Sequence, residues 1–464
     1  MKTRIEKDPM GVREIPADAY YGIQTLRAVE NFPISGLKPF PAFVKATALV
    51  KLAAARVNLA AGALKPKVAQ AIEQAAQEVV DGKLADQFVV DVFQAGAGTS
   101  HHMNVNEVLA NRAAEILGLP RGDTSQIHPN DHVNLGQSTN DVIPTAMRLA
   151  ALELSKGLVQ AVDVAAQTLS AKAREFATVV KSGRTHLQDA APIMLGQEVG
   201  AWARTLSRHR QWIEKERDTL KPLGIGGSAV GTGLNTPKGY REGMARELSA
   251  LTGEALTPAD DYFEAMQSMA PFAALSGAVR NLALDVTRIC NDLRLLSSGP
   301  NTGLGELILP AVQPGSSIMP GKVNPSIVEM VNMVAMQASG YDHTVALASA
   351  AGQLELNVMM PVIAYALLAQ LTYFTNALRV LEEKCLRGLA ADAKRCRMFA
   401  EKSPQLVTAL APRLGYAKAA EVAKKAIAEG KTIKEIVVAE GLLSEKEAAS
   451  ILDPARLTSP TRID

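Results

Sequence analysis

A short polar loop between two apolar stretches carries the side chains best suited to chemistry. Residues 314–325 read PGSSIMPGKVNP, with three prolines, two glycines and two adjacent serines. Gly and Pro at this density, inside a sequence of helical periodicity, predict a loop of defined shape. Ser316 and Ser317 offer hydroxyls that could act as a base or nucleophile, while Lys322 offers a cation and Asn324 a neutral donor. These groups suit a substrate that carries carboxylates, and a surface connection without function is the alternative.

Two polar segments upstream of this loop resemble helix beginnings. Thr99 follows the glycines of the run GAGTS, and Ser138, Thr139 and Asn140 form a row of neutral donors before an apolar-periodic stretch. Ser, Thr and Asn favour N-cap positions, so a purely structural role is one interpretation. A helix N-terminus also attracts anions, so the same donors could bind a carboxylate.

The remaining polar segments leave other interpretations open. Asp131 with His128 or His132 could form a metal or base cluster, but no metal-binding motif on a helix supports it, and we expect no metal. His186 lies among polar residues and could be a structural or a reactive histidine. Residues 224–235 contain five glycines but lack the lysine of a phosphate-binding loop, which predicts a connecting loop without a nucleotide.

The composition indicates a globular protein of more than one domain. The chain has 464 residues, which exceeds one ordinary hydrophobic core. Its formal net charge is only +2, which argues against nucleic acid or a membrane surface as a partner. Three scattered cysteines and an N-terminus without an apolar run suggest a reducing, cytoplasmic setting.

Helical periodicity dominates the middle of the chain. Apolar residues recur at steps of three and four from Leu275 to Leu296, which predicts one face of a long helix ending before Gly299-Pro300. Similar patterns run over about 145–176 and 196–220. The apolar stretch 358–374 contains a proline and is short for a bilayer span, so a buried helix is expected. Long helices of this kind predict a bundle.

The pattern of apolar and loop-forming residues changes twice along the sequence, which predicts three domains. Residues 1–137 are loop-rich and mostly helical, 138–395 hold the long helices and the polar loop, and 396–464 form a small helical domain. Two capping boxes mark short helices in the last domain, at Thr432 with Glu435 and at Ser444 with Glu447. Gly441 stands where a glycine would end the first of these helices.

The loop sequence GSSIMPGKVNP resembles the signature loop of the fumarase/aspartase superfamily, GSSxMPxKxN. The other polar segments match the family in the same order, so the resemblance covers nearly the whole chain. It implies a mainly α, three-domain fold whose central long-helix bundle is shared in a homotetramer. It also implies active sites composed from three subunits, a small dicarboxylate as substrate and no organic cofactor.

The resemblance assigns roles to individual residues. Ser316 matches the general base that removes a proton from the substrate Cβ, and Glu329 matches the carboxylate that partners His186. Lys322 and Asn324 match residues that bind a substrate carboxylate. The remaining substrate contacts of the family match Thr99, Ser138, Thr139, Asn140 and Thr185.

Two short runs resemble the aspartase members more than the fumarases. Ser138-Thr139-Asn140 matches the aspartase pattern, where fumarases usually read SSN, and Ala97-Gly-Thr99 also matches aspartases. The resemblance therefore implies anti-elimination of ammonia from L-aspartate through an aci-carboxylate intermediate, with fumarate as product. The alternative is the class II fumarase reaction on L-malate. A larger N-substituted aspartate, or a non-catalytic crystallin role, fits these motifs less well.

Overall fold

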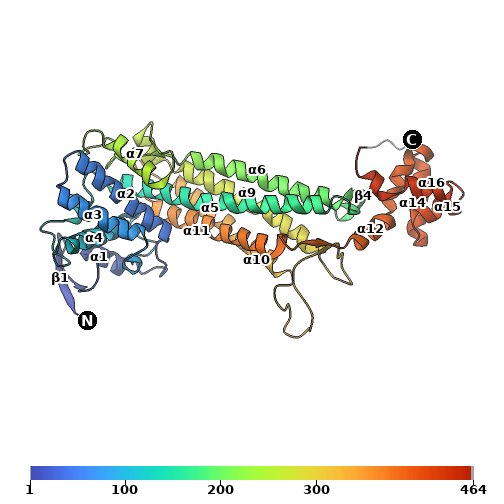
Figure 1. The fold of residues 1–464 in the computed structure, drawn as a ribbon, viewed down its shortest axis with the longest axis horizontal. Helices are drawn as coiled ribbons and strands as arrows, with labels where there is room; N and C mark the ends of the chain where they lie inside the picture. Colours follow the sequence, from blue (N-terminus) through green and yellow to red (C-terminus); the bar gives the residue numbers. More distant parts are fainter. Residues whose placement is uncertain (1, 461–464) are drawn as a thin grey trace. The chain divides into compact units, whose positions relative to one another are not determined.

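The computed structural model describes residues 2–460, which are mainly helical with a few two-stranded sheets (Figure 1). This confirms the mainly α class. The five longest described helices are α5 (Thr139–Glu175), α6 (Leu195–Asp218), α9 (Ala270–Leu296), α10 (Ser326–Ala350) and α11 (Met360–Leu381). Three of them occupy the predicted segments 145–176, 196–220 and 275–296, although α5 begins at 139 and α9 at 270, which is 145 − 139 = 6 and 275 − 270 = 5 residues earlier than predicted.

The chain divides into two compact units, which are described separately here. Unit 1 contains residues 1–159, 211–283 and 336–375, and unit 2 contains residues 160–210, 284–335 and 376–464. Each of the five long helices contributes residues to both units. The predicted domain boundaries after residues 137 and 395 stay predictions.

Unit 1 begins with a hairpin and a cluster of shorter helices. Its short elements are β1 (Thr3–Asp8), β2 (Gly11–Pro16), α1 (Ile23–Asn31), α2 (Pro41–Ala60), α3 (Pro66–Val80), α4 (Thr99–Ile116), β5 (Pro222–Leu223), α7 (Tyr240–Thr252), β6 (Thr257–Pro258) and α8 (Tyr262–Gln267). Strands β1 and β2 pair antiparallel. Helices α2, α3 and α4 share one apolar core that includes Leu52, Ile72 and Leu109. The α4 residues of this core run from Val105 to Ala113, and Thr99 begins the same helix.

In unit 1, α9, α10 and α11 pack as a bundle. The buried Gln370 amide of α11 donates to the carbonyl oxygens of Ser276 at 3.2 Å and of Ala338 at 3.0 Å. Ser276 also donates to Asp342 at 2.8 Å. Most of α11 is buried, which confirms the expected buried helix. Within residues 2–460, no helix is both long and apolar enough to cross a membrane.

Unit 2 contains a hairpin, a two-residue strand pair and the C-terminal helices. Its short elements are β3 (Val180–Thr185), β4 (Gln188–Met194), β7 (Leu307–Ile308), β8 (Ala390–Ala391), α12 (Ala393–Lys402), α13 (Ala411–Leu414), α14 (Tyr416–Glu429), α15 (Ile433–Ala439) and α16 (Glu445–Ile451). Both predicted capping boxes are present at the starts of α15 and α16. Gly441 has a positive φ of 64° just beyond α15, as expected for a glycine that ends a helix.

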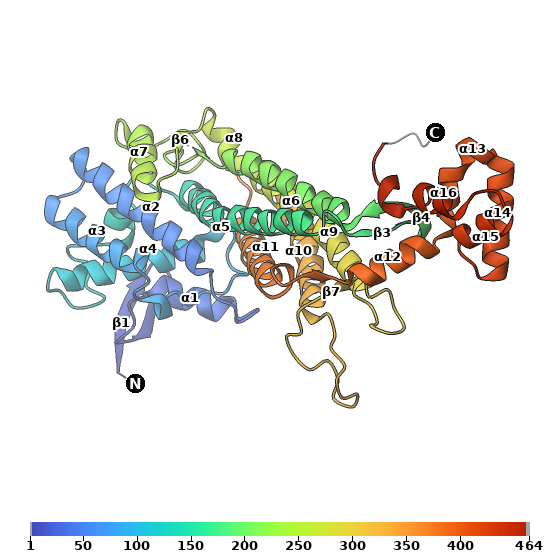
Figure 2. The ribbon, with the colours of Figure 1, turned by 45° about the vertical axis from the view of Figure 1, so that its right-hand side comes forward.

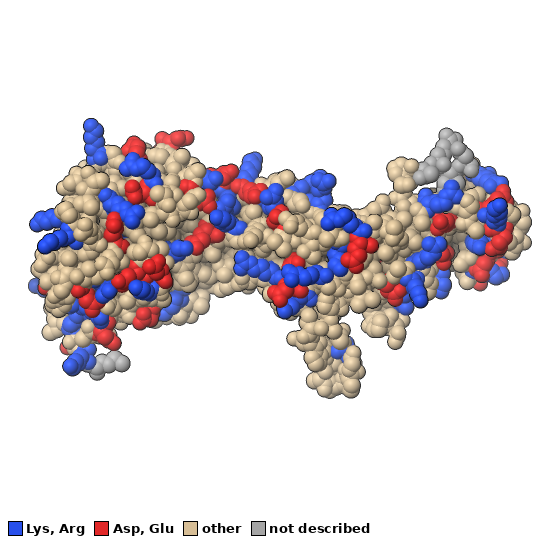
Figure 3. Space-filling view, in the orientation of Figure 1, with Lys and Arg blue, Asp and Glu red and all other residues tan. Residues whose placement is uncertain are grey.

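The long helices also pack together inside unit 2. His209 of α6 lies 2.8 Å from Asp285 of α9, and Asn332 of α10 donates to Asn291 of α9 at 2.9 Å. The α9 residues Val286, Ile289, Leu293 and Leu296 are buried, as their spacing predicted. On the face drawn in Figure 3, basic and acidic side chains are interspersed, in keeping with the small net charge.

Candidate active site

Helix α5 begins with the predicted donor row. The Ser138 hydroxyl accepts from the Asn140 N–H at 3.2 Å, and Asp141 accepts from the Ser138 N–H at 2.9 Å. This reciprocal pattern satisfies backbone donors at the first turn, so the predicted helix N-terminus is confirmed. The Asn140 amide donates to the carbonyl of Ala229 at 2.8 Å. Thr139 is half-buried at the first helical position.

The glycine-rich segment 224–235 reinforces this helix start. The second carboxylate oxygen of Asp141 accepts from the N–H groups of Gly226 and Ser228, both at 2.9 Å. Asp141 is fully buried, and burial raises its pKa to about 6. The segment is a connecting loop, as predicted, but it also holds the carboxylate that anchors the α5 donors.

Two buried residues that sequence reasoning missed lie behind Thr139. The Thr139 hydroxyl is 2.7 Å from Nδ1 of His102, and Nε2 of His102 is 2.6 Å from Nζ of Lys51. Lys51 comes from α2 and His102 from α4. A lysine in the middle of an alanine-rich helix is a sequence signal that could have drawn attention, because lysine is almost never fully buried without a partner.

Thr99 is the first residue of α4 and is exposed. The expected helix beginning is confirmed, but the N-cap is Gly98 rather than Thr or Ser. Gly98 has φ of +87°, and a Cβ there would lie 3.1 Å from a side-chain carbon of Ile143. A left-handed backbone in a tight space explains why glycine, and no side-chain cap, precedes Thr99.

The 314–325 loop lies in unit 2, between β7 and α10 (Figure 2). Its base is held together by two hydrogen bonds: the Gly315 N–H donates to the Lys322 carbonyl at 2.8 Å, and the Asn324 amide donates to the Gly315 carbonyl at 2.6 Å. A Cβ on Gly315 would lie 2.5 Å from the Asn324 nitrogen, so only glycine fits. The predicted loop of defined shape is confirmed.

Ser316 makes the most distinctive contacts of this loop. Its hydroxyl oxygen accepts from two backbone N–H groups, those of Ile318 at 3.2 Å and Met319 at 2.9 Å. The Ile318 side chain is 84% exposed, and Lys322 is also exposed. The serine is therefore fixed by the loop backbone, while the side chains of Ile318 and Lys322 near it are exposed.

Thr185 and His186 lie at the tip of the β3–β4 hairpin and are exposed. His186 and Leu187 form the two-residue turn with φ of 56° and 59°. Such a turn normally takes Gly or Asn, so two larger residues there store backbone strain. Arg184, next to Thr185, makes two bonds to the buried carboxylate of Glu306 at 2.9 and 3.0 Å. This ion pair anchors the strained tip.

Glu329 lies in the first turn of α10. Among the residues that the structure describes, neither its side chain nor that of His186 makes a hydrogen bond or an ion pair. The predicted pairing of the two stays a prediction. Unit 1 thus brings together Ser138, Thr139 and Asn140 and also holds Thr99; unit 2 holds Thr185, His186, Ser316, Lys322, Asn324 and Glu329.

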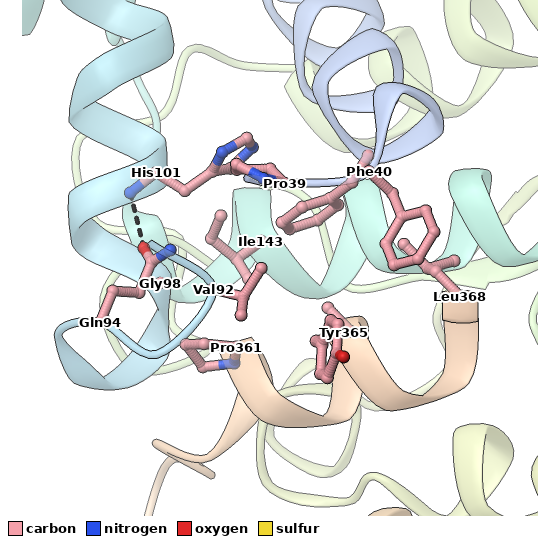
Figure 4. Close-up of a pocket in the computed structure, with 12 residues that line it drawn as sticks. Pro39, Phe40, Val92, Gln94, Gly98, His101, Ile143, Pro361, Tyr365 and Leu368 are labelled. Carbon is pink, nitrogen blue, oxygen red and sulfur yellow. Dashed lines mark hydrogen bonds between the residues drawn. The ribbon is translucent and has the colours of Figure 1, made fainter. Parts of the chain in front are cut away.

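An apolar pocket in unit 1 lies beside Gly98, and Figure 4 shows it lined by Phe40, Ile143, Pro361 and Tyr365. The pocket also includes His101, whose backbone N–H donates to the Gln94 side-chain oxygen at 2.6 Å. Burial lowers the pKa of His101 to about 3, so its imidazole is neutral. Apolar walls and a neutral histidine offer no charge for a dicarboxylate, so the lining of this pocket does not suit one.

Comparisons with known proteins agree with these motifs. Residues 11–340 match the family described as Lyase, and residues 406–459 match the one described as Fumarase C C-terminus. The aspartate ammonia-lyase of a Bacillus species is 46% identical over 98% of this chain and 98% of its own length. The class II fumarate hydratase of Thermus thermophilus is also 46% identical, over 99% of each chain.

A solved structure has the same fold. The fumarate lyase:delta crystallin of Brucella melitensis bound to cobalt superimposes with a TM-score of 0.96 at 49% identity, covering 99% of this chain and 100% of that one. Family match, full-length identity and fold therefore point the same way as the GSSIMPGKVNP loop. The chain belongs to the fumarase/aspartase superfamily and is a lyase.

Proposed function

We propose that this protein is an aspartate ammonia-lyase, a carbon–nitrogen lyase that converts L-aspartate to fumarate and ammonia reversibly. Relatives named for either reaction are 46% identical to this chain, so overall similarity does not choose between them. The Ser138-Thr139-Asn140 row at the start of α5, which resembles the aspartase pattern, carries the choice.

Ser316 would act as the general base. A neutral serine is a weak base, so its hydroxyl needs surroundings that favour the deprotonated oxygen. Two backbone N–H donors already point at this oxygen, and hydrogen bonds of this kind stabilise a negative charge. The oxygen would take the Cβ proton of L-aspartate, and the electron pair left on Cβ would expel the amino group from Cα.

Stabilising the intermediate requires donors aimed at one carboxylate. Removing the Cβ proton makes the neighbouring carboxylate an aci-carboxylate with two negative charges, which preorganised donors stabilise best. Lys322 and Asn324 would serve this carboxylate. Thr99, Ser138, Thr139, Asn140 and Thr185 would hold the rest of the substrate, with His186 oriented by Glu329.

A homotetramer with composite sites would bring these groups together. Two observations support this: His186 and Glu329 make no side-chain hydrogen bond or ion pair among residues 2–460, and the side chains of Ile318 and Lys322 near Ser316 are exposed. Helix α10 also exposes the apolar side chains of Met333 (66%), Met336 (67%) and Leu347 (61%). Apolar residues at such a density on one helix favour burial against another subunit.

The test is fumarate release, followed by ultraviolet absorbance, from L-aspartate and L-malate in parallel with one protein preparation. Fumarate from aspartate alone is the expected result. Fumarate from malate alone would replace the proposal with class II fumarate hydratase, the alternative that the Thermus relative supports. No fumarate from either substrate would contradict both.

A further inference from the structure

Lys51 is a fully buried basic side chain near the proposed site, with 0% exposure. Its nitrogen has three partners: Nε2 of His102 at 2.6 Å, Oδ1 of Asn134 at 2.9 Å and Oε1 of Gln137 at 2.9 Å. An ammonium group has three donors and no acceptor, so it matches three acceptors. The number and the distances of these three partners suit a positively charged Lys51 side chain.

The orientation of the two amides is set by their other contacts. The Asn134 nitrogen donates to the Gln137 carbonyl at 3.2 Å, and the Gln137 nitrogen donates to the carbonyls of Val133 at 3.1 Å and Leu135 at 3.2 Å. Flipping either amide would place its nitrogen against Lys51 and its oxygen against a carbonyl. Both amide oxygens therefore face Lys51, which must donate to each.

The remaining contact, with His102, sets the direction of a chain of hydrogen bonds. If the third donor of Lys51 binds Nε2 of His102, the proton of this neutral imidazole must sit on Nδ1. Nδ1 then donates to the Thr139 hydroxyl 2.7 Å away. A hydroxyl that accepts there has its own hydrogen left to donate elsewhere, and Thr139 has no other side-chain partner among residues 2–460.

We propose that Lys51 acts through His102 as a positioning residue, which turns the Thr139 hydroxyl into a fixed donor toward an anionic oxygen of the substrate. This inference rests on the proposed function, in which Thr139 contacts the dicarboxylate. It explains how the Thr139 hydroxyl can already be oriented as a donor before the substrate binds. A hydroxyl that is free to rotate would have to be oriented in each binding event.

The local charges allow only two arrangements. Burial lowers the pKa of Lys51 well below its usual value, and the negative charge of Asp141 acts in the opposite direction. Burial also lowers the pKa of His102, which keeps its imidazole neutral. A neutral lysine would accept from Nε2, the proton would leave Nδ1, and Thr139 would have to donate inward. The tautomer of His102 therefore decides the inference.

A direct test is solid-state NMR of the full-length protein with isotope-labelled histidine, without substrate. The His102 signal is identified by its absence in His102→Asn. A proton on Nδ1 is the expected result, and a proton on Nε2 would overturn the inference. This measurement needs no turnover, so it is independent of whether the protein uses aspartate or malate.

A kinetic test uses a pair of substitutions at one position. His102→Asn places an amide nitrogen near the position of Nδ1 and keeps a donor for Thr139. His102→Gln places an amide oxygen near Nε2, which keeps an acceptor for Lys51 but loses the donor. We expect Gln to raise the KM about tenfold to a hundredfold, the effect of one hydrogen bond to a charged group, and Asn to raise it less. The reverse ranking would overturn the inference.

Coupling between Lys51 and Thr139 separates positioning from simple stability. Lys51→Met should raise the KM, or the Kd for fumarate, about as much as Thr139→Val, with a smaller change in kcat. In the double variant the effects should not multiply, because both remove the same donor. Full multiplication would contradict the inference. Ile72→Val, which removes a buried methyl group in the same unit, is the control and should leave the KM unchanged.

If Lys51→Met does not fold, the His102 pair and the NMR measurement still decide the question. If aspartate is not turned over but malate is, the proposed function fails and the same substitutions are compared on malate. Each result therefore counts either for or against the role of Lys51.

Discussion

The start of α5 and the 314–325 loop hold different parts of the proposed site, and they differ in how their polar groups are satisfied. At the start of α5, Ser138 bonds to Asn140 and Asp141, and the Thr139 hydroxyl bonds to His102. Asp141 also accepts from the N–H of Gly226 in the glycine-rich loop. In the loop, the Ser316 hydroxyl accepts from two backbone N–H groups of the loop itself, and the neighbouring Ile318 is exposed. The polar groups at the start of α5 are held by other elements of the fold, whereas the loop holds its serine with its own backbone and exposes its side chains.

This difference matches two separate tasks. Binding an anion tightly benefits from donors that are already oriented, because no ordering cost remains. A serine base works best when water is excluded, and a loop can provide this only by closing after the substrate has entered. We therefore expect changes at α5 to affect mainly the KM and changes in the loop to affect mainly the kcat.

The largest effect should follow Ser316→Ala. Loss of a general base typically lowers turnover by about a hundredfold to ten-thousandfold. The loop is not part of a hydrophobic core, so the midpoint of thermal unfolding should stay unchanged. Fumarate release and thermal unfolding measure both. The neighbouring Ser317→Ala is the matched control, and equal losses in the two variants would contradict the assignment of the base.

Mixing two inactive variants should restore activity, and this gain should be nearly as large as the loss caused by Ser316→Ala. Ser316→Ala and Thr99→Ala subunits are each expected to be inactive, because each lacks one group of the site. If sites are composed from different subunits, mixed tetramers contain some complete sites and recover part of the activity. Activity is measured after joint refolding, with mixed tetramers shown by two different affinity tags. No recovery would argue against shared sites.

Gly315→Ala should have an intermediate effect. Its Cβ would lie 2.5 Å from the Asn324 nitrogen, so the base of the loop must open and move Ser316. Misplacing a catalytic group by about an ångström costs roughly a hundredfold in rate, so kcat should fall by about that amount. Gly321→Ala is the comparison variant, because at φ of +81° it adds backbone strain but its Cβ meets no atom within 4 Å, and it should cost less. Similar losses would show that the loop base is not special.

The smallest effect concerns two helix caps of the same kind. Ser138→Ala and Thr432→Ala each remove a side-chain cap, which typically costs about 1 kcal/mol of unfolding free energy. Only Ser138 belongs to the proposed site, so only its replacement should also raise the KM. Urea unfolding and steady-state kinetics make the comparison. An increased KM in Thr432→Ala would mean that the KM follows stability rather than the site.

Much of the fold could be predicted from local patterns. The 3.6-residue period located three of the five long helices, with ends within six residues of the observed ones. The two capping boxes marked α15 and α16, because a cap depends on residues only three apart. The prediction erred at Thr99, where glycine rather than a hydroxyl side chain caps the helix. A Cβ at position 98 would lie against the side chain of Ile143, so the close packing there favours glycine. This contact joins residues far apart in the sequence, and local capping preferences do not predict it.

The sequence alone determined the superfamily, the loop with Ser316 and the polar segments that lie at α5 and the β3–β4 turn, because these depend on short motifs. Only the tertiary structure showed that Lys51, His102 and Thr139, from three different helices, are linked by consecutive hydrogen bonds. It also showed that Arg184 and Glu306, far apart in the sequence, anchor the strained turn at His186. Such contacts form only when elements that are distant in the sequence pack together. The partners of a buried charge therefore cannot be identified from local sequence patterns.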